Sequence, residues 1–175
     1  YCFSPTKRFI CKYARANTNC KVILNGDGSE EIFGSYKYFE KAPNSRSFFN
    51  ENCKLLRQIY MYDVLRSDRC ISGNGLEART PFLDKTLVDY VMKINPELKM
   101  SNMGRMEKWI LRKAFDSSNL LPKEVLWRKK EAFSDGVSVE NLSWHTILQN
   151  HFNNLLSDDF YLRHVTKYSK NIPRT

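Results

Sequence analysis

The feature that most constrains this chain is a short β-branched run that passes through a glycine-rich, acidic turn into a helical pattern. The run is "KVILN" (21–25), and "GDGSEEIFGSYKYF" (26–39) follows it directly. A β-branched run that ends at glycine is typical of a buried strand, and the spacing behind the turn predicts a helix. We therefore expect a strand, turn and helix unit of the kind found in α/β folds.

Helical patterns dominate the rest of the sequence. The longest covers 50–71, where Leu55, Ile59, Met61, Tyr62 and Leu65 could line one side. A second covers 81–96, with Asp84 at its N-cap, Pro96 as its stop, and Leu87, Val88, Val91 and Met92 facing inward. Shorter helices are predicted over 106–118 and over 120–127, where Pro122 falls in the first turn. One strand followed by many helices indicates the helical half of an α/β domain.

Length and composition set the class of protein. The chain has 175 residues, of which 42% are hydrophobic, so it can bury a core in one domain. We expect that domain to cover 1–157, with 158–175 as a tail. No stretch resembles a signal peptide or a membrane span, which favours the cytosol. Five cysteines, never closer than nine positions apart, fit neither a disulfide framework nor a zinc site.

The net charge of +9 raises the question of a polyanionic partner. Only "WRKKE" (127–131) is densely basic, and the other lysines and arginines are scattered among acids. No groove-reading motif is present, so the sequence argues against nucleic-acid binding. His145, His151 and His164 have no carboxylate or thiolate at ligand spacing, and they are expected at the surface.

The acidic turn has two interpretations. A strand that enters a helix through glycines places free backbone N–H groups at the strand end, where phosphates bind. Gly26 and Gly28 would let the backbone approach a ligand, and Asp27 and Glu30 beside phosphates would require a hard cation such as Mg²⁺. Alternatively, the acids only favour a helix N-terminus. Spacing alone leaves both open.

Five motifs resemble the synthetase domain of the glutamine-hydrolysing asparagine synthetases, in the family's order. They are "NGDGSEEIFGSYKYFEKAP", "YMYDVLRSDR", "GLEARTPFLDK", "MEKWILRKAF" and "LLPKEVLWRKKEAFSDGV". The resemblance implies a PP-loop ATP pyrophosphatase fold, of which this chain holds mostly the helical C-terminal half with one central strand. It also implies a ligase that uses MgATP to convert aspartate to β-aspartyl-AMP, from which ammonia displaces AMP. In the family that ammonia comes from glutamine in an N-terminal domain, and we expect a homodimer for the full-length protein.

The sequence departs from the family in several places. The family usually has Ser where Asn25 stands, Glu or Asp at the Asp27 position, Asp at the Glu30 position and Gly at the Ser35 position. Neither the glutaminase cysteine nor the "SGG-x-D-S" PP-loop is found here. The chain begins with Tyr1 rather than Met. These observations together predict a fragment that is inactive by itself.

Residue by residue, the resemblance assigns roles within the turn. Asn25, Gly26 and Gly28 correspond to nucleotide-contacting positions. Asp27 corresponds to the carboxylate that handles the acyl-adenylate and accepts a proton from attacking ammonia. Glu30 corresponds to a carboxylate near Mg²⁺ and pyrophosphate.

Two further positions lie outside the turn. Lys130 corresponds to the lysine that stabilises charge as pyrophosphate leaves, whereas its neighbour Lys129 is expected to be solvated. Asp63 is assigned to support of aspartate or of Lys130, although it could equally pair with Arg66 on its own helix.

Other interpretations remain open at this point. Glu77 and Arg79 are expected to pair with each other in a connecting loop rather than to orient a pocket. A related adenylating enzyme, β-lactam synthetase, uses the same fold, but Asp27 argues against it. A truncated, non-catalytic remnant of the family is the remaining alternative.

Overall fold

The computed structural model describes residues 4–101, 104–131, 144–157, 159–160 and 162–163. The chain divides into two compact units, the first ending at Lys130 and the second beginning at Glu131. The second unit contains helix α9, Trp144–Leu155. The predicted division between a domain over 1–157 and a tail concerns the family domain, and it stays a prediction.

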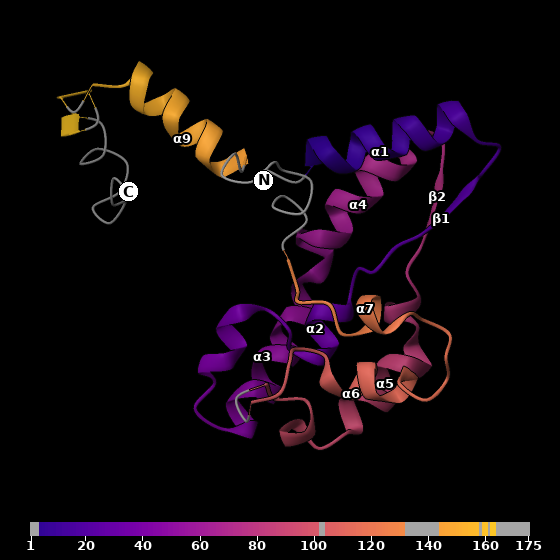
Figure 1. Ribbon diagram of the computed structural model, residues 1–175. Helices are drawn as coiled ribbons and strands as arrows, with labels where there is room; N and C mark the ends of the chain where they lie inside the picture. The colour runs from indigo at the N-terminus through magenta and orange to yellow at the C-terminus, as the bar shows by residue number, and fades with distance from the viewer. Residues whose placement is uncertain (1–3, 102–103, 132–143, 158, 161, 164–175) are drawn as a thin grey trace. The chain divides into compact units, whose positions relative to one another are not determined.

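The first unit is mostly helical (Figure 1). Its α-helices are α1 (Ser4–Asn17), α2 (Ser29–Phe33), α3 (Ser45–Gln58), α4 (Asp63–Ser72), α5 (Lys85–Lys93), α6 (Trp109–Phe115) and α7 (Lys123–Leu126). Its strands are β1 (Val22–Leu24) and β2 (Glu77–Arg79). Short 3₁₀ turns are η1 (Lys37–Lys41), η2 (Ile59–Met61), η3 (Pro81–Leu83) and η4 (Pro96–Leu98).

Strands β1 and β2 pair in parallel, with Ile23 opposite Ala78. The expectation of one strand was therefore wrong, because "EAR" (77–79) was assigned to a connecting loop. Two of its three residues are charged, so no β-branched pattern marked it as a strand. The expected pairing is confirmed: Arg79 Nε lies 2.6 Å from Glu77 Oε1, with both side chains largely exposed. Pairing with β1 is what makes this segment a strand.

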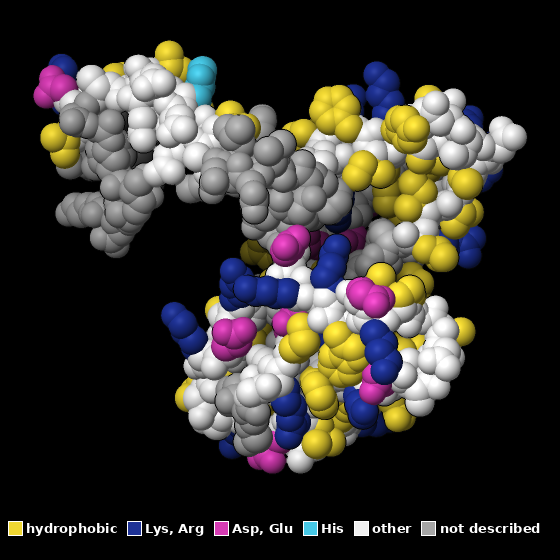
Figure 2. Space-filling model, in the orientation of Figure 1, with side chains coloured by type: hydrophobic (Ala, Val, Ile, Leu, Met, Phe, Trp, Pro, Cys, Tyr) yellow, Lys and Arg dark blue, Asp and Glu magenta, His cyan; other side chains and the backbone are white. Residues whose placement is uncertain are grey.

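Strand β1 is partly buried, and on one side only. Ile23 packs against a cluster formed by Cys11 of α1, Ile71 of α4 and Leu76. Val22 and Leu24 are 42% and 72% exposed and Ile23 is only partly buried, so the prediction of a buried strand was wrong. Figure 2 shows hydrophobic side chains gathered over α1 and the strand pair on this face of the molecule.

The long helix predicted over 50–71 is interrupted. Helix α3 ends at Gln58, η2 follows, and Tyr62 leaves the helical region with φ −119° and ψ −102° before α4 begins at Asp63. The break lets α3 pack on α2 while α4 packs on α1. Met61, Tyr62 and Leu65 are consequently exposed, so the predicted continuous apolar side was wrong.

Helix α5 confirms its predicted cap. Asp84 Oδ1 accepts hydrogen bonds from the N–H groups of Thr86 and Leu87, at 2.9 and 3.0 Å. Val91 is buried with Ile32 and Phe33 of α2, and Leu87 and Val88 pack at the edge of this cluster. Pro122 occupies the N-cap of α7 rather than its first turn, a small correction. No helix of the described residues is long and apolar enough to cross a bilayer.

Lys99 is a buried lysine in this core, with 2% of its surface exposed. Its Nζ donates to the carbonyl oxygens of Val91 at 3.1 Å and Ile32 at 3.4 Å, so it joins α2 to α5. Burial lowers the pKa of Lys99 to about 8, although the nearby Cys53 opposes the shift. A lysine with a lowered pKa favours the neutral amine in the folded state.

The lowered pKa of Lys99 predicts a pH-dependent stability. Between about pH 8 and 10 the unfolded chain binds the proton that the folded chain has released, so the free energy of unfolding should rise with pH. The rise is at most about 1.4 kcal/mol per pH unit. Urea unfolding of wild type and Lys99→Met at three pH values in this interval measures it. Lys99→Met should flatten the slope, whereas Lys93→Met, at an exposed lysine of α5, should leave it unchanged.

Candidate functional site

The acidic turn is fixed by its own hydrogen bonds. The Asn25 N–H donates to the Arg79 carbonyl at 2.9 Å, which continues the parallel ladder beyond β1. Asn25 Oδ1 then accepts the Asp27 N–H at 3.0 Å, and the Ser29 N–H donates to the Gly26 carbonyl at 3.2 Å. Side-chain bonding of this kind stabilises turns and competes with continued strand. The turn therefore presents its side chains at the carboxyl end of β1.

The backbone conformation and the surrounding space differ between the two glycines of the turn. Gly28 has φ +95°, and a Cβ there would collide with the Leu83 side chain of η3. A Cβ at Gly26 would meet no atom within 4 Å, and Gly26 is not among the residues with positive φ. Backbone conformation and packing therefore explain Gly28, whereas open space for a ligand remains an explanation only for Gly26.

Glu30, in the first turn of α2, joins two lysines from distant parts of the sequence. Its Oε1 lies 2.8 Å from Lys108 Nζ and 3.4 Å from Lys130 Nζ. Ser29 Oγ donates to Oε2 at 2.7 Å, and Lys108 Nζ also donates to Ser29 Oγ at 3.0 Å. We call Ser29, Glu30, Lys108 and Lys130 the lysine–glutamate cluster.

The electrostatics of this cluster favour the charged carboxylate. Burial raises the pKa of Glu30, but the ion pair and hydrogen bond with Lys108, the Ser29 hydrogen bond and the Lys130 charge together outweigh it. The pKa of Glu30 is thus lower than its ordinary value. Two ammonium groups against one carboxylate leave one excess positive charge, which suits an anionic ligand.

Lys130 is held from several sides. Its Nζ donates to the Ser35 carbonyl at 2.8 Å and lies 5.3 Å from the centre of the Tyr36 ring. The Tyr36 hydroxyl donates to Glu31 Oε1 at 2.7 Å and lies 3.4 Å from Asp63 Oδ2. Burial, followed by the hydrogen bond and charge of Glu31, raises the pKa of Tyr36, so it stays protonated. Asp63 therefore reaches Lys130 indirectly, through Tyr36.

Asp63 also forms the local ion pair that was the alternative interpretation, with Arg66 three residues along α4. Asp63 thus contacts Arg66 directly and is linked to Lys130 only through Tyr36. Its support of Lys130 in a reaction stays a prediction. Lys129 is exposed, as expected.

Asp27 lies apart from the lysine–glutamate cluster in its contacts. Lys7 Nζ of α1 approaches Asp27 Oδ1 at 3.1 Å and donates to Ser67 Oγ of α4 at 2.6 Å. Two carboxylates three positions apart therefore take different cationic partners. The structure brings Glu30 and Lys130 together and ties Asp63 to them, while Asp27 pairs with α1.

Sequence reasoning missed Lys7, Lys108 and Tyr36. Lys108 lay within a family-like motif, and its backbone is unusual for lysine, with φ +58° at the N-cap of α6. A non-glycine residue at positive φ often marks a functional position, but φ is invisible in a sequence. Tyr36 also lies within a family-like motif, and an aromatic residue by itself predicts only packing. Nothing in the sequence around Lys7 distinguishes it from Lys12, the other lysine of α1.

Few side-chain oxygens at this site are available as ligands for Mg²⁺. Among the described residues, no group of three His, Cys, Asp or Glu side chains could hold a metal ion. Glu30 supplies one carboxylate of the hard-oxygen type that Mg²⁺ prefers. In phosphate sites Mg²⁺ takes one or two carboxylates and completes its coordination with phosphates and water. Both Glu30 oxygens already have partners, Oε1 with the two lysines and Oε2 with Ser29, so the described residues form no protein-only metal site, and a metal here would take most of its ligands from phosphate and water.

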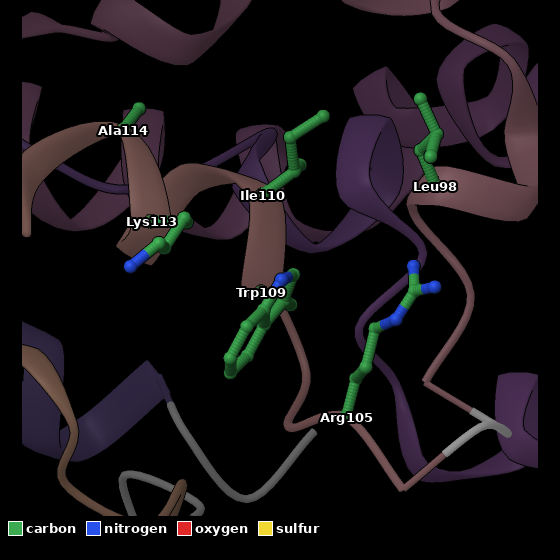
Figure 3. Close-up of a pocket in the computed structure, with 6 residues that line it drawn as sticks. All are labelled: Leu98, Arg105, Trp109, Ile110, Lys113 and Ala114. Carbon is green, nitrogen blue, oxygen red and sulfur yellow. The ribbon is translucent and has the colours of Figure 1, made fainter.

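A pocket lies elsewhere in the first unit (Figure 3). It has a volume of about 550 Å³ and is lined by Leu98, Arg105, Trp109, Ile110, Lys113 and Ala114. None of these residues belongs to the acidic turn or to the lysine–glutamate cluster. Convergent charges and hydrogen bonds identify a chemical site better than volume does, so we place the candidate site at the turn.

The first unit thus combines one parallel strand pair with a glycine-containing turn, and two lysines pair with one carboxylate beyond the end of β1. Comparison with known proteins gives the family. The asparagine synthase family profile matches residues 4–58 and 50–170. The chain belongs to the asparagine synthase family.

Individual relatives agree. The chain is 43% identical over 166 residues to the glutamine-hydrolysing asparagine synthetases of Cricetulus griseus and Homo sapiens, covering 95% of this chain and 29% of each relative. It is 42% identical over 176 residues to glutamine-hydrolysing asparagine synthetase 2 of Oryza sativa subsp. japonica, covering 98% of this chain and 29% of that protein. The predicted family is thus confirmed, and the chain spans less than a third of the length of these relatives.

The contrast between the two glycines of the turn can be tested by matched substitutions. Gly28→Ala should lower the free energy of unfolding by about 2 kcal/mol or more, because it adds backbone strain and a clash with Leu83. Gly26→Ala should change it by less than about 0.5 kcal/mol. Urea unfolding of the two variants measures both effects. Equal destabilisation by the two substitutions would contradict the structural role given to Gly28.

Proposed function

We propose that this chain is part of the synthetase domain of a glutamine-hydrolysing asparagine synthetase with a PP-loop ATP pyrophosphatase fold. The β-carboxylate of aspartate attacks the α-phosphorus of ATP and pyrophosphate leaves. Ammonia derived from glutamine then attacks the β-aspartyl carbon, and AMP leaves as asparagine forms. The observation that carries the proposal is the lysine–glutamate cluster, which places two ammonium groups on one carboxylate at the turn that matches the family.

Lys108 and Lys130 serve the phosphate chemistry. Negative charge accumulates on pyrophosphate as its bond to the α-phosphorus breaks, and preorganised cations stabilise that charge. Glu30 holds both ammonium groups in place before ATP binds. The Tyr36 ring and the Ser35 carbonyl hold Lys130 from the other side, and Asp63 supports Tyr36.

Asn25 and Gly26 contact the nucleotide in this proposal. Gly26 leaves open space beside the backbone, and Asn25 is fixed by hydrogen bonds within the turn. Glu30 is the described residue that would hold Mg²⁺, which neutralises phosphate charge when it binds with ATP.

Asp27 serves the second half of the reaction. As the nitrogen of ammonia bonds to the β-aspartyl carbon, it must lose a proton, and a carboxylate at this point can accept it. Asp27 is largely buried and paired with Lys7, which holds its carboxylate in place. Cytoplasmic location and a homodimeric full-length protein complete the proposal by analogy with the family.

A chimera provides the assay for these roles. Residues 4–170 of this chain replace the matching segment of the human relative, with which the chain shares 43% identity. The unaltered chimera should form asparagine from aspartate, MgATP and glutamine. A folded chimera without this activity would contradict the proposed function.

Lys130 and Lys129 give a matched pair for the first half-reaction. Lys130→Ala should lower aspartate-dependent pyrophosphate exchange in the chimera by about 10²-fold or more, the scale for removing one preorganised charge-stabilising group. Lys129→Ala, at an exposed neighbour, should change the rate by less than about 2-fold. Similar small losses in both variants would remove Lys130 from the mechanism.

Asp27→Asn separates the two half-reactions. The amide keeps the size of the side chain but loses its charge and basicity, so asparagine formation should fall by about 10²-fold or more while ATP affinity stays within a few fold. Glu30→Gln should instead raise the Mg²⁺ concentration needed for half-maximal rate. Steady-state kinetics and calorimetry with MgATP measure these quantities. Equal loss of ATP binding in both variants would refute this division of roles.

A further inference from the structure

The two carboxylate oxygens of Asp27 have different contacts. The side chain is only 11% exposed, and Oδ1 lies 3.1 Å from the Lys7 ammonium. Oδ2 is buried and has no hydrogen-bond partner among the described residues. A buried carboxylate oxygen without a donor is unfavourable, so it marks a place where a ligand can supply the missing bond.

Lys7 is itself held at a second point. Its Nζ donates to Ser67 Oγ at 2.6 Å, and Ser67 is 2% exposed within α4. An ammonium group bonded to two acceptors from different segments has little freedom to move. Helix α1 packs on α4, which fixes the base of the Lys7 side chain as well. The position of Asp27 is thus set by both helices through one lysine.

The Asn25 side chain likewise has one atom with a hydrogen-bond partner and one without. Its Oδ1 accepts the Asp27 N–H, whereas its Nδ2 is buried without a partner among the described residues. The turn therefore keeps one unsatisfied acceptor, Asp27 Oδ2, and one unsatisfied donor, Asn25 Nδ2. A ligand that satisfies both must present a hydrogen-bond donor and an acceptor oxygen.

We infer that Lys7 is a positioning residue for the amide-forming step, an inference that rests on the proposed function. Lys7 holds Asp27 Oδ1, so Oδ2 is the oxygen that accepts the proton from ammonia as the carbon–nitrogen bond forms. The Asn25 amide donates to an oxygen of the activated aspartyl group. Lys7 does not contact the reacting atoms, and it acts only through Asp27.

A purely structural role for Lys7 has a different consequence. If the lysine only fastened α1 to the unit, its loss would weaken both half-reactions together through instability. A positioning role instead affects the ammonia-dependent step while adenylation at Lys108 and Lys130 continues. The two half-reactions therefore separate the two roles.

The first experiment tests the geometry on the complete 175-residue chain. A carbodiimide activates carboxylates, and an amine in contact then forms an amide with loss of one water. Mass spectrometry should find a Lys7–Asp27 cross-link in wild type and in Lys12→Arg, and none in Lys7→Arg. The exposed Lys113–Asp116 pair, 2.7 Å apart, serves as the internal control. Cross-linking of the control pair without a Lys7–Asp27 product would overturn the inference.

The second experiment tests the role in the chimera. Lys7→Met should slow asparagine formation by about 10-fold or more, less than the loss of the base itself, while pyrophosphate exchange stays within about 3-fold. Lys7→Arg should recover most of the rate because it restores the cation. Lys12→Met, at an exposed position of α1, should change neither rate. Thermal unfolding of each variant checks that it remains folded.

The outcomes are distinguishable. Equal loss of both half-reactions in Lys7→Met, or no recovery in Lys7→Arg, would make Lys7 a structural tether and overturn the inference. Full activity in Lys7→Met would overturn it as well. An unaltered chimera that folds but makes no asparagine would overturn the proposed function, and the role of Lys7 with it. Loss of activity in Asp27→Asn together with normal activity in Lys7→Met would support the proposed function and overturn the role of Lys7.

Discussion

The candidate site depends on the cations and hydrogen-bond donors that replace the water lost by the partly buried Glu30 carboxylate. A carboxylate removed from water loses hydration energy, and it stays ionised only if cations and donors replace the lost water. Here Lys108, Lys130 and the Ser29 hydroxyl do so, and the pKa of Glu30 falls despite burial. Lys108 lies 78 positions after Glu30 in the sequence, and Lys130 lies further on, at the end of the first unit. One carboxylate therefore connects the turn to the start of α6 and to the end of the first unit.

The same compensation orders the surrounding aromatic and acidic groups. Lys130 rests on the Tyr36 ring, and the Tyr36 hydroxyl is held by Glu31 and Asp63. Glu31 is buried, and burial raises the pKa of its carboxyl even though the Tyr36 hydrogen bond opposes the shift. Neighbouring glutamates in one helical turn thus differ in their tendency to ionise. Helix α2 is short, yet it places Glu30 toward two cations and Glu31 into the core.

Much of this arrangement was predictable from local patterns. The strand and turn of "KVILNGDG" follow from β-branched residues ended by glycine, and the Asp84 cap follows from an acid before an apolar helical pattern. Lys130 and Glu30 were identified through a family resemblance, and the structure places them 3.4 Å apart. Their catalytic roles stay predictions.

The rest depends on tertiary contacts that no local pattern encodes. Strand β2 contains two charged residues and exists because β1 pairs with it, and the break at Tyr62 exists because α3 and α4 pack on different partners. Lys7 and Lys108 are ordinary lysines in the sequence. Their ion pairs arise only when α1 and the start of α6 approach the turn.

The separate partners of Asp27 and Glu30 have an evolutionary consequence. The two carboxylates lie three residues apart, but one takes its cation from α1 and the other from residues 108 and 130. Substitutions in α1 can therefore alter the environment of one acid while the other keeps its partners. Evolution can therefore change the surroundings of one carboxylate of the turn without changing those of the other.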